Sequence, residues 1–374
     1  MLFAVSQNSL RSIISLLWLQ RDESLFRKLL LFPLWILSLF VALVVRQRRV
    51  RLSPLAHRVS ARVISVGNIA VGGTGKTPVT IELGQRLVAR GRRVAILSRG
   101  YGRKETEPLV VSDGTSILAT AEEGGDEPIV IAQALPSVPV LVGQDRAALA
   151  DMAIERFGCE FLLLDDGFQH LKLARDVDIV LFDGSNPFGN GHLIPRGPLR
   201  EGKSALRHAN LTWITKLENA RPGEVEALAA QLESMTGRPP IFSTTRVRDV
   251  TELSGESLGT KALAGARVFL ACGLARPEAF HKTVQSLGAT IVGEALFDDH
   301  HTFCAADLAS IEARARALGA ETIAITAKDA AKIQAIAQAA PDAFEEPLSC
   351  RVVVVHVQLE IVSGSALLDE VLAL

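Results

Sequence analysis

The sequence predicts an α/β protein with a mostly parallel sheet and helices on both of its faces. Two observations lead to this prediction: the composition is that of an ordinary globular protein, and from residue 61 onward short apolar runs alternate with helical patterns. Strands buried on both faces read as nearly continuous apolar runs, and alternating βαβ units build a parallel sheet. The predicted strands of the first half are 63–66, 94–97, 138–142, 161–164, 178–182 and 211–215.

The chain of 374 residues is long enough for two domains with separate cores. We expect an N-terminal hydrophobic and basic segment over 1–60, a core domain over 61–235 and a second, smaller α/β domain over 236–374. The second domain is predicted from its own alternation of elements. These are strands at 268–272, 290–292, 322–326 and 351–357, and helices at 276–287, 305–318 and from 328 onward.

The N-terminal segment differs from the rest in charge and hydropathy. Residues 1–60 hold nine Lys and Arg and two acids, although the whole chain has a net charge of −1. Residues 29–45 carry no charge, contain Pro33, and are flanked by basic residues. This run is at the short end of what spans a bilayer, and a proline shortens an uninterrupted helix. A spanning helix, an interfacial helix and a buried core helix remain open, and we favour a membrane-embedded anchor whose basic flanks meet anionic lipid.

A glycine-rich turn between the strand at 63–66 and a helical pattern over 76–90 is typical of a phosphate-binding loop. Its glycines let backbone N–H groups converge on phosphate oxygens at the positive end of the helix. Lys76 would reach the β- and γ-phosphates, and the Thr77 hydroxyl would bind Mg²⁺. The alternative is a glycine-rich turn before an ordinary helix. The loop residues are Ala70, Val71, Gly72, Gly73, Thr74, Gly75, Lys76 and Thr77, and Ala70 replaces the usual first glycine, which a negative φ would permit.

A pair of carboxylates follows the apolar strand at 161–164. Asp165 and Asp166 are the oxygen ligands that Mg²⁺ prefers, at the position where a nucleotide-hydrolysing fold organises its metal. A strand-end Asp pair is also ordinary turn chemistry. Its occurrence together with the phosphate loop favours the metal interpretation.

Other polar residues follow the predicted strands. Arg99 either neutralises phosphate or lies on a solvated loop, and Tyr101 beside it is the only tyrosine of the chain. Asp126 opens a helix, where it is at least a helix cap. Adjacent residues such as His300 and His301 do not easily face one metal, so this pair is expected to be loop polarity unless its context says otherwise.

Composition also limits the classes of partner and compartment. The balanced charge gives no reason to expect nucleic acid as a partner. The four cysteines, Cys159, Cys272, Cys304 and Cys350, form no CxxC pair, which favours reduced thiols over disulfides or a zinc site.

Taken together, these segments resemble the lipid A 4′-kinase family, the tetraacyldisaccharide 4′-kinases. The resemblance runs in order from about residue 62 to 332, although the chain has Ile-Thr-Ala-Lys-Asp at 325–329 where we expect Thr-Thr-Glu-Lys-Asp. The matching segments are 66–68, 72–78, 98–103, 125–128, 165–170, 188–191, 197–201, 299–300 and 326–329.

The resemblance implies a P-loop NTPase-like fold and transfer of the ATP γ-phosphoryl group, with Mg²⁺, to the 4′-hydroxyl of a tetraacylated glucosamine disaccharide 1-phosphate. The reaction would take place at the cytoplasmic face of the inner membrane, with the second domain closing over the nucleotide. By the same resemblance Asp126 is the general base and His300 its partner. Lys76, Asp165, Asp166 and Glu201 would organise phosphate and metal, and phosphate or substrate contacts would come from Arg99, Tyr101, Gln169, His170 and Arg200.

Two other functions fit parts of the pattern. A membrane-associated P-loop NTPase that drives a partner protein would need a base-specificity motif of the Asn-Lys-x-Asp kind, and residues 215–218, Thr-Lys-Leu-Glu, imitate it poorly. A nucleotide-binding scaffold without catalysis would not need the Asp165–Asp166 pair.

Overall fold

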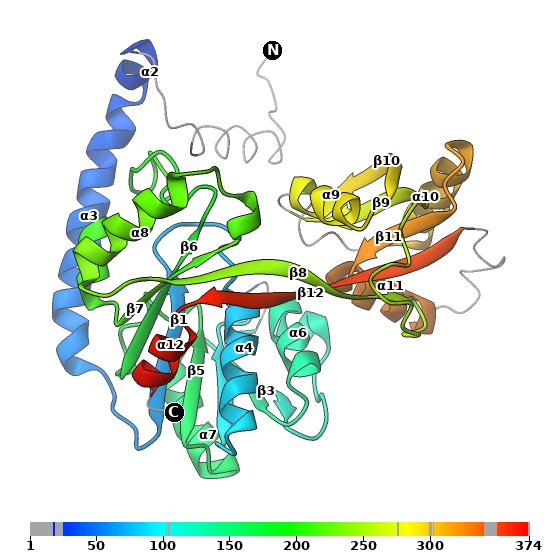
Figure 1. Cartoon of the computed structure of the whole chain (residues 1–374). Coiled ribbons are helices and arrows are strands. Elements are labelled where there is room, and N and C mark those ends of the chain that lie inside the picture. The colour runs from blue at the N-terminus through cyan, green and yellow to red at the C-terminus, as the bar shows by residue number, and fades with distance from the viewer. Residues whose placement is uncertain are drawn as a thin grey trace, which may run out of the picture. The chain divides into compact units, whose positions relative to one another are not determined.

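The computed structural model describes residues 18, 25–101, 103, 105–274, 277–298, 301, 303–339 and 350–372. The chain forms two compact units. Unit 1 comprises Met1–Thr244 together with Ile361–Leu374, and unit 2 comprises Thr245–Glu360. Two long strands, β8 (Ile241–Glu252) and β12 (Arg351–Ser363), carry the chain from one unit to the other (Figure 1).

The sheet of unit 1 is mostly parallel, as predicted, with the strand order β8-β7-β6-β1-β5-β2-β4-β3. Strand β1 lies between β5 and β6 and is parallel to both, while β3 is antiparallel to β4 at the edge. The strands are β1 (Arg62–Asn68), β2 (Val94–Ser98), β3 (Leu109–Asp113), β4 (Pro139–Val142), β5 (Phe161–Asp165), β6 (Val177–Asp183) and β7 (Leu211–Thr215).

Helices cover this sheet on both faces. Leu162 and Leu164 of β5 pack in one cluster with Leu149 and Ala153 of α7 (Arg146–Phe157). Strand side chains alternate, so Leu163, which is fully buried, points to the opposite face, and α4 (Lys76–Ala89) also contacts β5. The other helices of the unit are α5 (Ala121–Gly124), α6 (Asp126–Ala134), α8 (Glu224–Thr236) and α12 (Ser365–Leu372), with short 3₁₀ turns at Lys203–His208 and Leu217–Asn219.

Unit 2 has its own parallel strands, in the order β10-β9-β11-β12, and its own core. Strands β10 and β12 extend five and six residues beyond the predicted ends at 292 and 357. The elements of this unit are β9 (Arg267–Gly273), α9 (Pro277–Ser286), β10 (Thr290–Phe297), α10 (Ala305–Ala317), β11 (Thr322–Thr326) and α11 (Ala327–Ala339).

The N-terminal segment forms α2 (Leu25–Leu30), α3 (Phe32–Leu52) and a 3₁₀ turn at Ser53–Leu55. We expected Pro33 to shorten the helix. It does not interrupt α3, because it lies in the first turn, where its missing N–H is not needed. The helix continues through the basic run to Leu52. Among the helices that the structure describes, none combines the length and the apolar character needed to cross a membrane.

One face of α3 packs against the rest of unit 1, and another is exposed. Leu31 and Ser38 are buried, and the Ser38 hydroxyl donates to the Leu193 carbonyl at 2.8 Å. Large apolar side chains on the rest of the helix are accessible to solvent, and most of them are at least half exposed. They include Phe32, Trp35, Ile36, Leu37, Leu39, Phe40, Leu43 and Val44.

Candidate active site

The phosphate-loop pattern occupies the turn between β1 and α4. Gly72 and Gly75 have φ values of 126° and 82°, which favour glycine, and Gly75 precedes the first residue of the helix, Lys76. Among the described residues other than glycine, positive φ is found at Asp166 and Lys216, so Ala70 has the negative φ that its replacement of glycine requires. Thr77 is the second residue of α4.

The ends of β6 and β7 hold the outer side of this loop. The Thr215 hydroxyl donates to the Thr74 carbonyl at 2.8 Å, and the Lys216 ammonium donates to the Gly73 carbonyl. Lys216 also forms an ion pair with Asp183 at 3.2 Å. A trans peptide unit points its N–H opposite to its carbonyl, so these contacts orient the loop N–H groups away from β7.

Asp166 and its cationic partners lie next to the loop. The Arg200 guanidinium donates to both Asp166 oxygens, at 3.0 and 3.1 Å, and the Lys76 ammonium lies 3.8 Å from Asp166 Oδ1. Burial raises the pKa of Asp166, but Lys76 and Arg200 outweigh it and hold the pKa below its ordinary value. The predicted residues Lys76, Asp166 and Arg200 are therefore brought together.

Asp165 has different surroundings, although it is the adjacent residue. Its side chain is fully buried and accepts a hydrogen bond from Thr80 at 3.3 Å. Burial, with the nearby charge of Glu127, raises the pKa of Asp165 to about 7, while Lys76 partly offsets the rise.

A loop that runs antiparallel to the phosphate loop positions Arg200 and Glu201. The Val71 N–H donates to the Pro198 carbonyl at 2.8 Å, and the Arg200 N–H donates to the Ile69 carbonyl at 2.7 Å. The segment at 197–201, which was predicted only from the family resemblance, is thus held beside the phosphate loop.

Gln169 connects the strand-end loop to Glu201. Its amide donates to the Asn68 carbonyl at 2.8 Å and to Glu201 Oε1 at 3.0 Å. The other partner of Glu201 is Arg49 of α3, which donates to both carboxylate oxygens. Close approach of β1 makes this loop compact, because a Cβ on Gly67 would lie 2.5 Å from the Cβ of Phe168.

Asp126 is the first residue of α6 and follows Gly125, whose φ is 91°. Its neighbour Glu127 contributes to the raised pKa of Asp165 at the end of β5. A Cβ on Gly125 would lie 3.2 Å from the Tyr101 carbonyl, which brings the loop at 99–101 to the same place. Arg99 and the Tyr101 side chain are both exposed.

Arg146 is a candidate that the sequence did not single out. It begins α7 after β4, is buried, and donates to the Gln144 carbonyl at 3.0 Å. Its Nε has no hydrogen-bond partner in the part of the chain that is described. Burial and Arg99 lower its pKa, whereas Asp166, Asp165 and Asp145 oppose that change. The available signal was its position, directly after a strand of the predicted sheet.

His170 lies in the same charged surroundings. Burial, with the charges of Arg146 and Arg175, lowers its pKa to about 4, so its ring is neutral near pH 7. Its Nε2 is buried and has no hydrogen-bond partner among the residues described. A neutral ring nitrogen at this place can accept or donate one hydrogen bond.

The predicted partner of Asp126, His300, lies outside the described residues. No cluster of three or more His, Cys, Asp and Glu side chains suited to a metal occurs within the described ranges. Asp165 and the Thr77 hydroxyl are nevertheless hard oxygen donors at the loop, and the raised pKa of Asp165 marks a carboxylate that a cation would stabilise. In contrast, both Glu201 oxygens already accept hydrogen bonds from Arg49.

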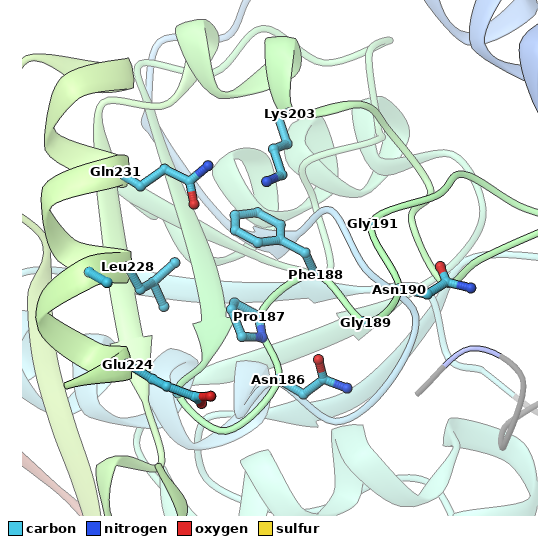
Figure 2. A pocket seen from close by; sticks show the side chains of 12 residues that line it. Asn186, Pro187, Phe188, Gly189, Asn190, Gly191, Lys203, Glu224, Leu228 and Gln231 are labelled. Atoms are coloured by element: carbon cyan, nitrogen blue, oxygen red, sulfur yellow. The ribbon is translucent and has the colours of Figure 1, made fainter. Parts of the chain in front are cut away.

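A separate cavity of about 370 Å³ lies between the loop after β6 and α8 (Figure 2). The Lys203 ammonium lies 4.0 Å from the centroid of the Phe188 ring at its wall. Leu228 and Gln231 of α8 line the opposite side. None of the described residues predicted for the nucleotide or metal site lines this cavity.

The parallel sheet, the loop between β1 and α4, and the carboxylates at the end of β5 define a P-loop nucleotide-binding protein. Comparisons with known proteins give the particular family. The family model described as Tetraacyldisaccharide-1-P 4'-kinase matches residues 30–373. The chain belongs to this family of kinases of lipid A biosynthesis, as the sequence predicted.

Individual relatives agree with this assignment. The chain is 48% identical over 308 residues to a tetraacyldisaccharide 4'-kinase of Anaeromyxobacter sp. (strain Fw109-5), covering 82% of this chain and 80% of that protein. It is 45% identical over 287 residues to the enzyme of the same name from Syntrophus aciditrophicus, covering 74% and 76%. The crystal structure of LpxK from Aquifex aeolicus in complex with ATP has a TM-score of 0.71 and 26% identity, covering 92% of this chain and 97% of that one.

Proposed function

We propose that this chain transfers the γ-phosphoryl group of ATP to the 4′-hydroxyl of a tetraacylated glucosamine disaccharide 1-phosphate. The observation that carries the proposal is the convergence of Lys76, Asp166 and Arg200 beside the loop that opens α4. Family membership supplies the chemical identity of the acceptor. In this proposal the phosphate loop, with Lys76 and Arg200, binds the triphosphate, and the acceptor sugar approaches it from the side of α6.

ATP would lie with its phosphates against the loop 70–77 and the positive end of α4. Lys76 and Arg200 would neutralise the charge that spreads over the transferred phosphoryl oxygens, which is the main protein contribution to a loose transition state. Arg146, with a buried unpartnered Nε, is a further donor for a phosphate oxygen. Tyr101, Arg99 and His170 remain predicted substrate or phosphate contacts.

Mg²⁺ would be held by Thr77 and Asp165, and Asp166 would orient Lys76 and Arg200 around it. A cation held by these residues would supply positive charge that offsets the negative charge of the phosphates. The raised pKa of Asp165, at about 7, supports this role, because a nearby cation favours the ionised carboxylate. We infer that Glu201 acts through its partners and does not ligate the metal.

Asp126 would act as the general base that accepts the proton of the 4′-hydroxyl. A sugar hydroxyl is a poor nucleophile, so a carboxylate within hydrogen-bond reach assists its attack. The position of Asp126 at the start of α6, against the loop that follows β2, supports this role. The role of His300 as its partner rests on the resemblance alone.

The lipid acceptor requires the enzyme to work at a membrane surface. We infer that the exposed apolar residues of α3, with the exposed Arg46, Arg48 and Arg51, lie against the cytoplasmic side of the inner membrane. Nucleic acid has no part in the proposed reaction.

The test is incubation with Mg-ATP and tetraacyl disaccharide 1-phosphate in detergent micelles, followed by mass spectrometry of the lipid. The expected product is a bisphosphorylated lipid. Asp126→Asn should bind ATP as the wild type does and lower kcat by about 10²-fold or more, since general base assistance contributes 10²–10⁴-fold.

The exposed Glu122→Gln, on the preceding helix α5, is the matched control and should keep kcat within about twofold. No phosphorylated lipid from the wild type, with ATP hydrolysis that depends on a partner protein, would favour the alternative of a partner-driven NTPase. Full turnover by Asp126→Asn would remove Asp126 from the mechanism and leave the kinase activity in place.

A further inference from the structure

Arg49 lies near the end of α3 but does not belong to the exposed basic run around it. Arg46, Arg48 and Arg51 are exposed, whereas the Arg49 side chain is only 11% exposed. Its guanidinium donates to Glu201 through Nε at 3.2 Å and through Nη2 at 3.0 and 2.8 Å. The Glu201 side chain is 5% exposed, so the pair is almost completely removed from water.

The same guanidinium contacts the loop after β5. Its Cζ lies 4.8 Å from the centroid of the Phe168 ring, and its Nη2 donates to the Phe168 carbonyl at 3.4 Å. A planar guanidinium that binds a carboxylate and also stacks on an aromatic ring has few alternative orientations. Arg49 therefore joins three segments that are far apart in the sequence: α3, the loop at 166–170 and the loop at 197–201.

From Glu201 the contacts continue to the phosphate loop. Gln169 donates to Glu201 at 3.0 Å, and Arg200 donates to the Gln169 side-chain oxygen at 3.5 Å. Arg200 in turn binds Asp166, which lies 3.8 Å from the Lys76 ammonium. One continuous set of polar contacts thus leads from α3 to the residue that would bind the β- and γ-phosphates.

The position of the pair favours a geometric role over a simple contribution to stability. A buried ion pair gains little net free energy because desolvation of both charges opposes their attraction. Removing one partner, however, leaves the other charge buried and alone, and a catalytic group displaced by about 1 Å can lose 10²-fold in rate. A planar guanidinium that donates to both carboxylate oxygens specifies the orientation of Glu201 more tightly than a single ammonium would.

We propose that Arg49 is a positioning residue for phosphoryl transfer: it fixes Glu201 and Gln169 so that Arg200 and Asp166 meet Lys76. The inference rests on the proposed function. It gives α3 a second task besides contact with lipid, because the helix then also supports the geometry at the nucleotide phosphates.

The test compares Arg49→Ala, Arg49→Lys and the control Arg58→Ala in the lipid-kinase assay, with nucleotide-binding sites counted by titration with a fluorescent ATP analogue. Arg58 is the first arginine after α3, is exposed, and carries the same charge. Arg49→Ala should lower kcat per nucleotide-binding site about tenfold or more while the KM for ATP changes less than about threefold. Arg49→Lys should fall between it and the wild type, and Arg58→Ala should stay within about twofold of the wild type.

Chemical rescue by free guanidinium distinguishes a loss of positioning at the active site from a loss of folded protein. Guanidinium chloride at tens of millimolar should raise kcat of Arg49→Ala severalfold and leave the wild type and Arg58→Ala unchanged. The inference is overturned if kcat of Arg49→Ala per binding site stays within twofold of the wild type or if Arg58→Ala loses as much. A loss that neither Lys nor guanidinium restores, or that follows the number of binding sites, also overturns it.

If Arg49→Ala does not fold, Arg49→Lys decides alone, and a kcat equal to that of the wild type counts against the inference. A wild-type protein that makes no bisphosphorylated lipid removes the proposed function and this inference together. An active wild type with a fully active Arg49→Lys and Arg49→Ala removes the inference alone.

Discussion

Asp165 and Asp166 are consecutive residues with the same side chain, yet the fold places them in opposite electrostatic environments. Asp166 has a positive φ of 54° and points to Arg200 and Lys76, which lower its pKa. Asp165 ends β5 with its side chain in the buried layer, where desolvation raises its pKa to about 7. Neighbouring carboxyl groups whose pKa values are shifted in opposite directions commonly mark a functional site.

The raised pKa of Asp165 predicts a pH-dependent stability. In the folded protein Asp165 keeps its proton up to about pH 7, whereas in the unfolded chain it loses the proton near 3.8. Between these values the folded state binds more protons, so this group makes the free energy of unfolding fall as the pH rises, by an amount on the order of 4 kcal/mol. The loss levels off above pH 7.

Asp165→Asn should therefore remove part of this slope and be more stable than the wild type at pH 8, with a Tm higher by several degrees. Thermal unfolding of the nucleotide-free protein between pH 5 and 8 measures the difference. The control is Asp113→Asn, because hydrogen bonds from Thr115 and Ser116 lower the pKa of Asp113, so Asp113 stays ionised from pH 5 to 8 and the slope of this variant should match that of the wild type. Parallel Tm curves for Asp165→Asn and the wild type would contradict the prediction.

The sequence alone was sufficient to predict those site residues that belong to a short local motif. The glycines, Lys76 and Asp166 could be found because each belongs to a short pattern after a strand, whereas Arg200 was predicted from the family resemblance alone. Lys76, Asp166 and Arg200 do lie together. Arg146 was missed although it follows a predicted strand, and Arg49 had no local signal, because what distinguishes both is burial, and burial depends on packing between distant segments. Nothing in the run of arginines at 46–51 sets Arg49 apart before the helix is docked.

At the scale of elements, strand ends determine how the phosphate loop is held. Thr215 and Lys216 follow directly on one another at the end of β7, and each binds one carbonyl of the loop. Lys216 adopts a φ of 57°, an unfavourable conformation for a side chain with a Cβ, and its second contact is the buried Asp183. Such a conformation persists where surrounding contacts require it.

We expect Lys216→Met to weaken ATP binding more than it slows turnover. The substitution removes the donor for the Gly73 carbonyl and leaves Asp183 without this cation, and hydrogen bonds to charged groups contribute about 1.5–3 kcal/mol. The KM for ATP should rise about tenfold or more, and kcat at saturating ATP should change less. The exposed Lys172→Met serves as the control, and an unchanged KM in Lys216→Met would refute the role.

The regular elements were predictable to different degrees. All six predicted strands of the first half occur within two residues of their predicted ends, because central parallel strands are apolar throughout. Strand β3 was missed because it is a short edge strand with polar residues, and β8 because its exposed positions interrupt the apolar pattern. The return of α12 to unit 1 depends on contacts such as that of Arg86 with Asp369, which no local pattern shows.

At the scale of the whole molecule, charge and hydropathy are divided unevenly along the chain. The first 60 residues carry a net charge of +7, against −1 for the entire chain. Within α3 most of the exposed large apolar residues come first, from Phe32 to Val44, and the exposed arginines follow together with Val50. A contiguous exposed apolar surface with basic residues at one end is typical of a helix that lies in a lipid interface.

Phe40→Glu combined with Val44→Glu should therefore detach the protein from lipid. These two side chains are 62% and 61% exposed and lie one turn apart on the same face of α3, so the substitutions should leave the fold intact while two charges enter the proposed interface. Each basic residue near an anionic surface contributes about 1 kcal/mol, so wild-type binding should also weaken as the salt concentration rises.

In sedimentation with anionic phospholipid vesicles, the double variant should need about tenfold more lipid for half-maximal binding. The control, Leu118→Glu with Val357→Glu, changes two apolar side chains of 56% and 50% exposure elsewhere in the chain and should bind as the wild type does. If the α3 variant and the control sediment alike, α3 is not the lipid contact, and the apolar side chains between Phe32 and Val44 must be explained by a protein partner.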